Sequence, residues 1–178
     1  SGTESLLAVA PSRGGLRHAQ EEARAIDALF RPHARPLVGD EATESRFKQI
    51  AGDFRMLHLA THGHFNRTSP LLSGLELEAD QGDDGMLRVH EILDLSLQAN
   101  LVTLSACDTA LGSGYFADTP AGDEFVALNR AFLAAGSASV MATLWQVDDQ
   151  ASVALMKQFY GRLRTSVDGG SAANALAL

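Results

Sequence analysis

The chain has 178 residues, of which 46% are hydrophobic; this suffices for the core of one domain and excludes a disordered or collagen-like chain. Its 14 basic and 22 acidic residues give a formal net charge of −8, which argues against nucleic acid or an anionic membrane surface as a direct partner. Cys107 is the only cysteine, and the sequence shows neither a signal peptide nor an apolar run of about 18 residues, so we expect a cytoplasmic protein without disulfides.

The first part of the chain alternates strands with helices. We expect residues 1–5 to be a flexible start, in which Ser1-Gly2 resembles a cloning remnant. Apolar runs and helical spacing then predict, in chain order, a strand at Leu6–Ala10, a helix at Arg17–Phe30, a strand at Arg35–Val38, a helix at Ala42–Ile50 and a strand at Met56–Thr61. Helices between apolar strands indicate parallel strands joined by helical crossovers.

The segment 70–94 breaks this alternation. Leu75 and Leu77 alternate with acidic residues, which is typical of a strand with one solvent-exposed face. A turn rich in Gly and Asp over residues 81–85 leads to a second short strand at Met86–Val89. We therefore expect a β-hairpin that lies outside the main sheet.

The remainder of the chain returns to the strand–helix pattern. The sequence predicts an interior strand at Leu101–Ser105, a helix from Asp123 that ends at Gly136, a buried strand at Ser139–Trp145 and a helix at Gln150–Leu163. The tail at Ala172–Leu178 is typical of a helix that is cut short. The apolar sides of the two long helices are expected at Phe125, Val126, Leu128, Phe132 and Leu133, and at Val153, Leu155, Met156, Phe159 and Leu163.

These elements define the expected architecture. Residues 6–178 form a single α/β domain, because no internal repeat or linker divides them. A mostly parallel central sheet is flanked by helices and carries an inserted β-hairpin.

Two of the predicted strands end in reactive side chains. Met56–Thr61 leads into His62-Gly63, and Leu101–Ser105 leads through one alanine into Cys107. Ligands of open α/β sheets lie beyond the carboxyl ends of the strands, so neighbouring strands would bring the imidazole and the thiol to one crevice. A histidine within hydrogen-bond reach can take the proton of a cysteine and return it to a leaving amine, which is the chemistry of acyl transfer.

The same strand ends offer donors for an oxyanion. Gly63 has no side chain, so its backbone N–H can approach the negative charge that develops on a carbonyl oxygen. The backbone N–H of Cys107 is the second candidate donor.

Other interpretations of these residues are open. A lone cysteine after a core strand is often a small buried hydrophobic residue, and a lone histidine is often a satisfied polar residue. His58, His62 and His64 have the same parity along an extended strand and could form a zinc site with Cys107. We expect no metal here, because no second cysteine is present and His58 lies inside an apolar strand.

With these residues placed, the sequence resembles a CHAT domain, a member of the caspase-like clan of cysteine peptidases. The resemblance covers nearly the whole chain, from Glu21-Glu22-Ala23 and Gly39-Asp40-Glu41-Ala42-Thr43 through the LHLATHG, LVTLSACDTALG and RAFLAAGSASVMATLWQVDD blocks to the helix with Met156, Phe159 and Tyr160. It implies a caspase-like three-layer sandwich in which His62 is the catalytic histidine and Cys107 the nucleophile. It also implies a peptide-bond hydrolase without a cofactor, often joined to a tetratricopeptide or other sensor region that keeps it inactive until a partner signals.

The resemblance further suggests where a substrate would bind. In caspase-like folds the strand after the post-nucleophile helix commonly pairs with the substrate backbone, which points to Trp145, Gln146, Val147 and Asp148 as the lining of the pocket. The acidic side chains around this strand end would favour a basic residue before the scissile bond. Alternatively, Asp148 only caps the last helix and Trp145 fills the core.

Two functions from different classes follow. We expect a cysteine endopeptidase that cleaves a protein or peptide substrate through a His62–Cys107 dyad, under the control of a sensor region outside this chain. The alternative is a non-catalytic signalling or partner-binding module that retains the fold. Replacing the Cys107 thiol separates the two, because it abolishes cleavage in the first case and leaves the biological output intact in the second.

Overall fold

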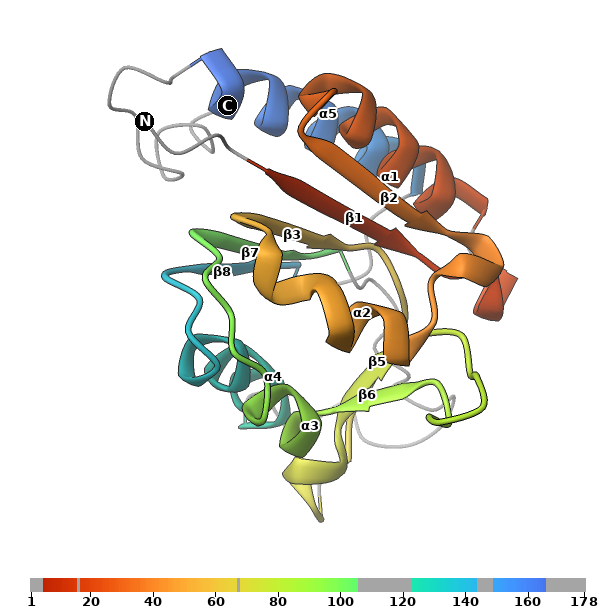
Figure 1. Cartoon of the computed structure of the whole chain (residues 1–178), viewed down its shortest axis with the longest axis vertical. Coiled ribbons are helices and arrows are strands. Elements are labelled where there is room, and N and C mark those ends of the chain that lie inside the picture. Colours follow the sequence, from red (N-terminus) through yellow and green to blue (C-terminus); the bar gives the residue numbers. More distant parts are fainter. Residues whose placement is uncertain (1–4, 16, 67, 106–122, 144–148, 166–178) are drawn as a thin grey trace.

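The computed structural model describes residues 5–15, 17–66, 68–105, 123–143 and 149–165. At its centre lies a five-stranded sheet, in the order β2-β1-β3-β7-β8, and all four strand pairs are parallel (Figure 1). The strands are β1 (Leu6–Ala10), β2 (Ala34–Val38), β3 (Met56–Leu59), β7 (Leu101–Leu104) and β8 (Val140–Ala142). The predicted α/β class is confirmed, and every residue of β1, β3 and β7 is buried, as expected for interior strands.

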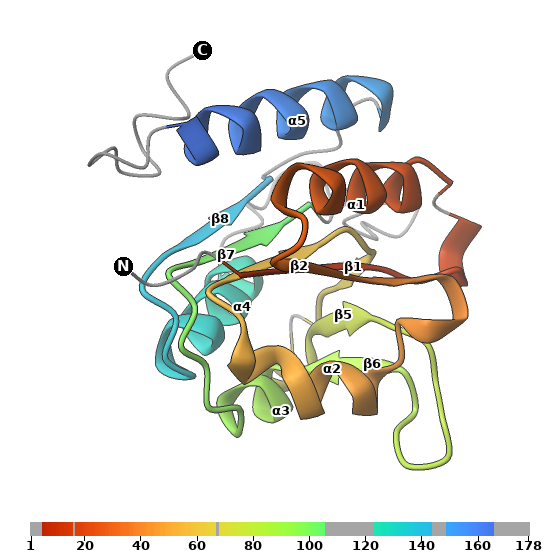
Figure 2. The same ribbon diagram turned by 45° about the horizontal axis from the view of Figure 1, so that its top comes forward.

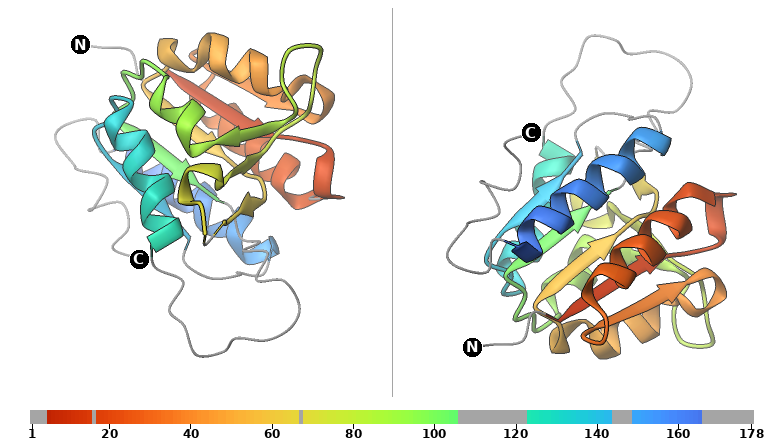
Figure 3. Two further views of the ribbon diagram at one scale, coloured as in Figure 1. Left: turned by 90° about the horizontal axis from the view of Figure 1, so that it is seen from below. Right: turned by 90° about the horizontal axis from the view of Figure 1, so that it is seen from above.

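Helices cover both faces of the sheet. One face carries α1 (Arg17–Phe30) and α5 (Asp149–Thr165), which pack side by side, and the other carries α2 (Glu44–Ile50), α3 (Val89–Leu93) and α4 (Asp123–Ala134) (Figures 2 and 3). Successive strand residues point to opposite faces, so each strand contributes to two separate apolar cores. The result is a three-layer domain. Within the described residues, no helix is long and apolar enough to cross a membrane.

The segment between β3 and β7 forms a second, smaller sheet. Its strands are β4 (Gly63–His64), β5 (Gly74–Glu76) and β6 (Met86–Arg88), paired antiparallel in the order β4-β5-β6. β5 and β6 are the predicted hairpin outside the main sheet. The two-residue strand β4 and the one-turn helix α3 were not predicted, because neither is long enough to show a period in the sequence.

Short turns join several of these elements. Single turns of 3-10 helix lie at Arg13–Gly15 (η1), Gly39–Glu41 (η2), Ala51–Asp53 (η3) and Pro70–Leu72 (η4). Helix α2 begins two residues later than predicted, because the Thr43 side chain accepts a hydrogen bond from the backbone N–H of Arg46 (3.3 Å) and so caps the helix.

Three residues predicted to face the core are exposed instead. In α4, Leu128 and Phe132 are buried, but Val126 and Leu133, which are seven residues apart, share a different side of the helix and are 36% and 45% exposed. Leu155 in α5 is likewise 36% exposed. An apolar helix stripe is narrower than the set of apolar residues in these helices, so composition alone overstates the buried side.

The last strand of the main sheet lies within its predicted range. β8 spans Val140–Ala142 of the expected Ser139–Trp145, and the last two residues of that range lie outside the described ones. β8 is half-buried, because the sheet order places it at the edge of the described strands. The predicted truncated helix at Ala172–Leu178 lies outside the described residues.

The end of α4 depends on a glycine with a conformation that other residues rarely adopt. Gly136 has φ of +113°, and a Cβ atom there would lie 2.4 Å from the carbonyl oxygen of Leu97. The same backbone approach lets the N–H of Leu97 donate to the carbonyl of Ala135 (2.8 Å). The turn between α4 and β8 thus has room only for a residue without a side chain.

We expect Gly136→Ala to lower the free energy of unfolding by about 2 kcal/mol or more, because it combines strain in φ with a steric clash. Gly161→Ala in α5 is the matched control: a Cβ there meets nothing within 4 Å, and alanine favours a helix by up to about 1 kcal/mol. Urea unfolding followed by circular dichroism measures both. Equal stability of the two variants would contradict this account of the turn.

Candidate functional site

The strands that lead to His62 and Cys107 are direct neighbours. β3 pairs with β7 in parallel register, with Leu59 opposite Leu104, and the N–H of Ser105 extends the ladder by donating to the carbonyl of Leu59 (2.9 Å). The sequence prediction that these strand ends meet at one edge of the sheet is therefore confirmed. Cys107 itself, two positions beyond Ser105, lies outside the described residues.

The backbone at His62 is held by the smaller sheet. The carbonyl of His62 accepts a hydrogen bond from the N–H of Glu76 (2.9 Å). The hydroxyl of the preceding residue, Thr61, donates to the carbonyl of Glu76. On the following side, Gly63 pairs with Leu75 in the β4–β5 ladder and is buried. His62 itself is half-buried, and its backbone is fixed through these contacts with strand β5.

The carboxylate of Glu76 gathers two further side chains beside this backbone clamp. His64 Nε2 lies 3.2 Å from Oε2 of Glu76, and Arg13 Nε lies 3.2 Å from Oε1. Glu76 was not recognised as a site residue from the sequence. The alternation of apolar and acidic residues placed its side chain on the polar side of a strand, but nothing in the pattern indicated that this strand pairs beside His62.

The three histidines of the alternative zinc site have separate surroundings. His58 is fully buried and its Nε2 lies 2.9 Å from Oε1 of Glu22, whereas His64 is exposed against Glu76. Among the residues that the structure describes, His58, His62 and His64 do not bring three ligand atoms within 4.8 Å of one another. The described histidines therefore do not form a zinc-binding set.

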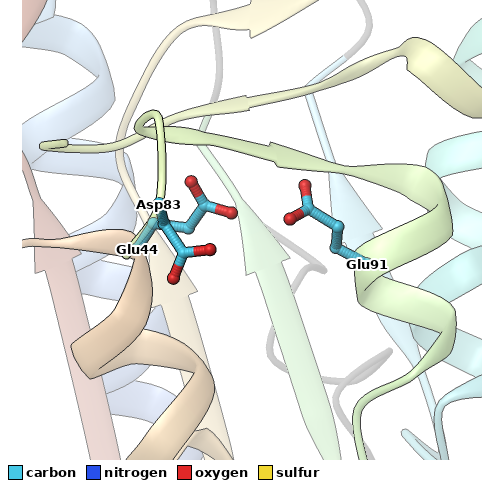
Figure 4. Close-up of side chains that lie close together, drawn as sticks. All are labelled: Glu44, Asp83 and Glu91. Atoms are coloured by element: carbon cyan, nitrogen blue, oxygen red, sulfur yellow. The ribbon is translucent and has the colours of Figure 1, made fainter. Parts of the chain in front are cut away.

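One acidic cluster does bring three possible ligand atoms together. Glu44, Asp83 and Glu91 have carboxylate oxygens within 4.8 Å of one another (Figure 4). The ammonium of Lys48 contacts all three, at 2.6 Å from Glu44, 2.9 Å from Asp83 and 2.6 Å from Glu91. Because this ammonium already supplies the positive charge, the cluster acts as an ion-pair clamp that joins α2, the turn before β6 and α3.

The electrostatics of this Lys48 cluster follow from its burial. Desolvation lowers the pKa of Lys48, but its hydrogen bonds to three carboxylates outweigh this and raise it above the ordinary range. Desolvation raises the pKa of Glu44, and the nearby Glu91 adds to this. Burial also tends to raise the pKa of Glu91, but hydrogen bonds from the Lys48 ammonium and from the backbone N–H of Arg88 outweigh this effect and lower the pKa. The clamp therefore depends on Lys48 remaining charged.

The predicted substrate-binding residues are not among those described. Trp145, Gln146, Val147 and Asp148 follow β8 in the chain, within the stretch 144–148 that the structure does not describe. Their role, like that of Cys107, stays a prediction from the sequence.

The fold and the strand ends define a class of protein. It is a three-layer α/β domain with a parallel five-stranded sheet, a small antiparallel insertion and a histidine held where the insertion leaves the sheet. The model of the CHAT domain family matches residues 5–178, so the chain belongs to this caspase-like family. The resemblance inferred from the sequence blocks is confirmed.

Two curated relatives are similar to most of this chain. The chain is 28% identical to tetratricopeptide repeat protein 28 of Mus musculus over 183 residues, which cover 84% of this chain and 7% of the relative. It is 26% identical to the Homo sapiens protein of the same name over 192 residues, which cover 89% of this chain and 7% of the relative. The chain thus spans a small part of the length of these relatives.

We expect Lys48→Met to lower the free energy of unfolding at pH 7 by about 3 kcal/mol, because it leaves three clustered carboxylates without their counter-charge. Without the ammonium, these carboxylates hold protons more tightly in the folded state than in the unfolded chain. The loss should therefore shrink as the pH falls from 7 to 4, since protonation then favours the folded state. Chemical unfolding at several pH values measures both effects.

Lys157→Met is the matched control for this prediction. Lys157 lies exposed on α5, so its substitution should change stability by no more than about 0.5 kcal/mol at any of these pH values. A Lys48→Met loss that is the same at pH 7 and pH 4 would show that the cluster does not stabilise the protein through charge.

Proposed function

We propose that this chain is the peptidase domain of a cysteine endopeptidase, with His62 as general base and Cys107 as nucleophile. The observation that carries the proposal is the register of β3 with β7, whose carboxyl ends lie side by side and lead within a few residues to the histidine and the cysteine. This edge is where open α/β sheets bind their ligands. Membership of a caspase-like family supports the same assignment.

The proposed reaction has two halves. In the first, His62 removes the thiol proton of Cys107, and the thiolate attacks the carbonyl carbon of the scissile peptide bond. The backbone N–H groups of Gly63 and Cys107 donate to the oxyanion of the tetrahedral intermediate. Collapse of this intermediate breaks the C–N bond, and the proton on His62 passes to the leaving amine. In the second half, His62 activates a water molecule that hydrolyses the thioester and restores the thiol.

The backbone clamp at His62 supports this role. A general base acts only from within hydrogen-bond reach of the proton it removes, and a displacement of about 1 Å can cost a factor of about 10² in rate. Glu76 of β5 makes both of the hydrogen bonds that hold this backbone: its carbonyl accepts from the hydroxyl of Thr61, and its N–H donates to the carbonyl of His62. The smaller sheet thus fixes the backbone from which the imidazole projects.

For the substrate we propose an extended peptide that adds to the free side of β8. This strand is half-buried, and within the described residues it is the edge strand of the sheet, the position at which a peptide can add by β-augmentation. Trp145, Gln146, Val147 and Asp148, which follow it, would line the pocket for the residue before the scissile bond. The acidic balance of the chain favours a basic residue there, unless Asp148 serves only to cap α5.

We further propose that the full-length protein is cytoplasmic, needs no cofactor and controls this domain through a sensor region. Both relatives are named as tetratricopeptide repeat proteins. We therefore expect a tetratricopeptide region as the sensor that accompanies this domain in the full-length protein.

The proposal is tested with an electrophilic peptide probe, an acyloxymethyl ketone with arginine before the ketone. Because Cys107 is the only cysteine, an adduct located by mass spectrometry is unambiguous. We expect labelling of Cys107 that falls by a factor of about 10² or more in His62→Ala. His64→Ala is the control, since that imidazole lies exposed against Glu76, and it should label at the unsubstituted rate. Equal labelling of His62→Ala and the unsubstituted chain would overturn the proposal.

One observation favours the alternative, a signalling module that works by binding. Leu71, Leu72, Leu93 and Leu133 are each between 43% and 56% exposed, and they lie on η4, α3 and α4, which contact one another. Exposed apolar side chains that gather on neighbouring elements are typical of interaction surfaces. If binding is the function, Cys107→Ala leaves the biological output of the full-length protein unchanged. If cleavage is the function, the same substitution abolishes that biological output.

A further inference from the structure

A chain of buried polar side chains links the sheet to the helix layer formed by α1 and α5. Oε1 of Glu22 lies 2.9 Å from Nε2 of His58, Nδ1 of His58 lies 3.3 Å from the phenol oxygen of Tyr160, and that phenol donates to Oγ1 of Thr103 (2.8 Å). None of the four is more than 2% exposed. We call these four residues the polar network. It joins α1, β3, α5 and β7.

The polar network crosses the two strands at matching positions. His58 on β3 is the register partner of Thr103 on β7, and the hydroxyl of Tyr160 contacts both side chains. His62 follows His58 by four residues, and Cys107 follows Thr103 by the same number. One hydroxyl on α5 therefore joins the two strands at equal chain distances from the two proposed catalytic residues.

The geometry around Tyr160 holds this hydroxyl in place. Its ring makes edge contacts with His58, Phe30 and Phe159, at centroid distances of 5.5, 5.9 and 5.1 Å. Burial raises the pKa of the phenol well above its ordinary value, and the nearby charge of Glu22 adds to this. The phenol therefore keeps its proton throughout the physiological range and remains able to donate to Thr103.

A buried polar network costs more desolvation free energy than an apolar core of the same shape. Apolar residues of the same shape would pack at this face without the desolvation that a buried carboxylate and imidazole require. What hydrogen bonds add is direction: they define one position of α5 against the strands, whereas apolar contacts allow several. The apolar cluster on this face surrounds the polar network, and Asp27 on α1 and Ser152 on α5 are further buried polar residues of this layer. The polar network is distinguished by the hydrogen bonds through which Tyr160 on α5 reaches both strands.

Resting on the proposed function, we infer that Glu22, His58, Thr103 and Tyr160 are positioning residues for the catalytic dyad. They fix β3 against β7 beneath the proposed site, and thereby set the distance between the imidazole of His62 and the thiol of Cys107. None of the four contacts the substrate or the reacting atoms in this proposal.

The test measures how readily the Cys107 thiol ionises. The rate constant for alkylation by iodoacetamide is recorded against pH; a thiol paired with a histidine reacts at lower pH than a free cysteine, whose pKa is about 8.5. We expect Tyr160→Phe and Thr103→Val, which remove one hydroxyl each, to lower the rate constant at pH 6.5 by about tenfold and to shift the profile upward by about one pH unit. Thr103→Ser, which keeps the hydroxyl, should retain the unsubstituted profile.

The double variant Tyr160→Phe/Thr103→Val sharpens the test. If the two hydroxyls act through their shared hydrogen bond, the double variant should lose no more than either single variant. Phe132→Leu is the control for a general loss of packing, because Phe132 is fully buried in α4 on the opposite face of the sheet. It should leave the pH profile unchanged.

The outcomes separate the inference from the function on which it rests. If the unsubstituted profile is that of a free thiol and His62→Ala does not change it, the dyad itself is absent and both proposals fall. If the unsubstituted profile depends on His62 but Tyr160→Phe and Thr103→Val match it, the peptidase proposal stands and the positioning role is overturned. A shift in Phe132→Leu as large as in Tyr160→Phe would also overturn the positioning role, since loss of packing would then explain it.

Discussion

The parallel pairing of β3 with β7 is the constraint on which the rest of this structure depends. Two parallel neighbours cannot be joined by a tight turn, so the chain between Leu59 and Leu101 has to leave the sheet and return to its opposite end. In many α/β proteins a single helix makes this connection. Here the connection builds β4, β5, β6 and α3, and its first strand begins directly after His62, the residue proposed as the general base. The position of His62 is thus decided jointly by two sheets.

The two faces of the main sheet are held to their helices by different interactions. The face toward α2, α3 and α4 is an apolar core that also receives Leu75, Leu77 and Leu87 from the insertion, so burial of these side chains anchors the smaller sheet. Charge then refines that attachment, because the Lys48 clamp joins α2 to the insertion at its periphery. The face toward α1 and α5 combines apolar packing with the buried hydrogen bonds of Tyr160 and His58. Orientation is defined on this face by the hydroxyl of Tyr160, which contacts side chains of both β3 and β7.

The sequence predicted those parts of the molecule that carry a repeated signal. Apolar runs located all five strands of the main sheet, and Arg17–Phe30 was placed with its observed bounds because its charged and apolar sides alternate clearly. Val126, Leu133 and Leu155 were misplaced because the sequence shows that a residue is apolar but not how wide the buried stripe is. Glu76 escaped notice because its importance lies in a backbone contact across two strands, and backbone hydrogen bonds leave no trace in side-chain identity.

The distribution of amines over the molecule has a practical consequence. The chain contains two lysines, Lys48 and Lys157. Acylating reagents attack the neutral amine, and the ammonium of Lys48 is kept protonated among three carboxylates, whereas Lys157 projects from α5 into solvent. A succinimidyl fluorophore applied at pH 8.5 therefore distinguishes the two side chains without mutagenesis. Lys157 is three residues from Tyr160, so a dye on its side chain reports on the helix whose tyrosine contacts both β3 and β7.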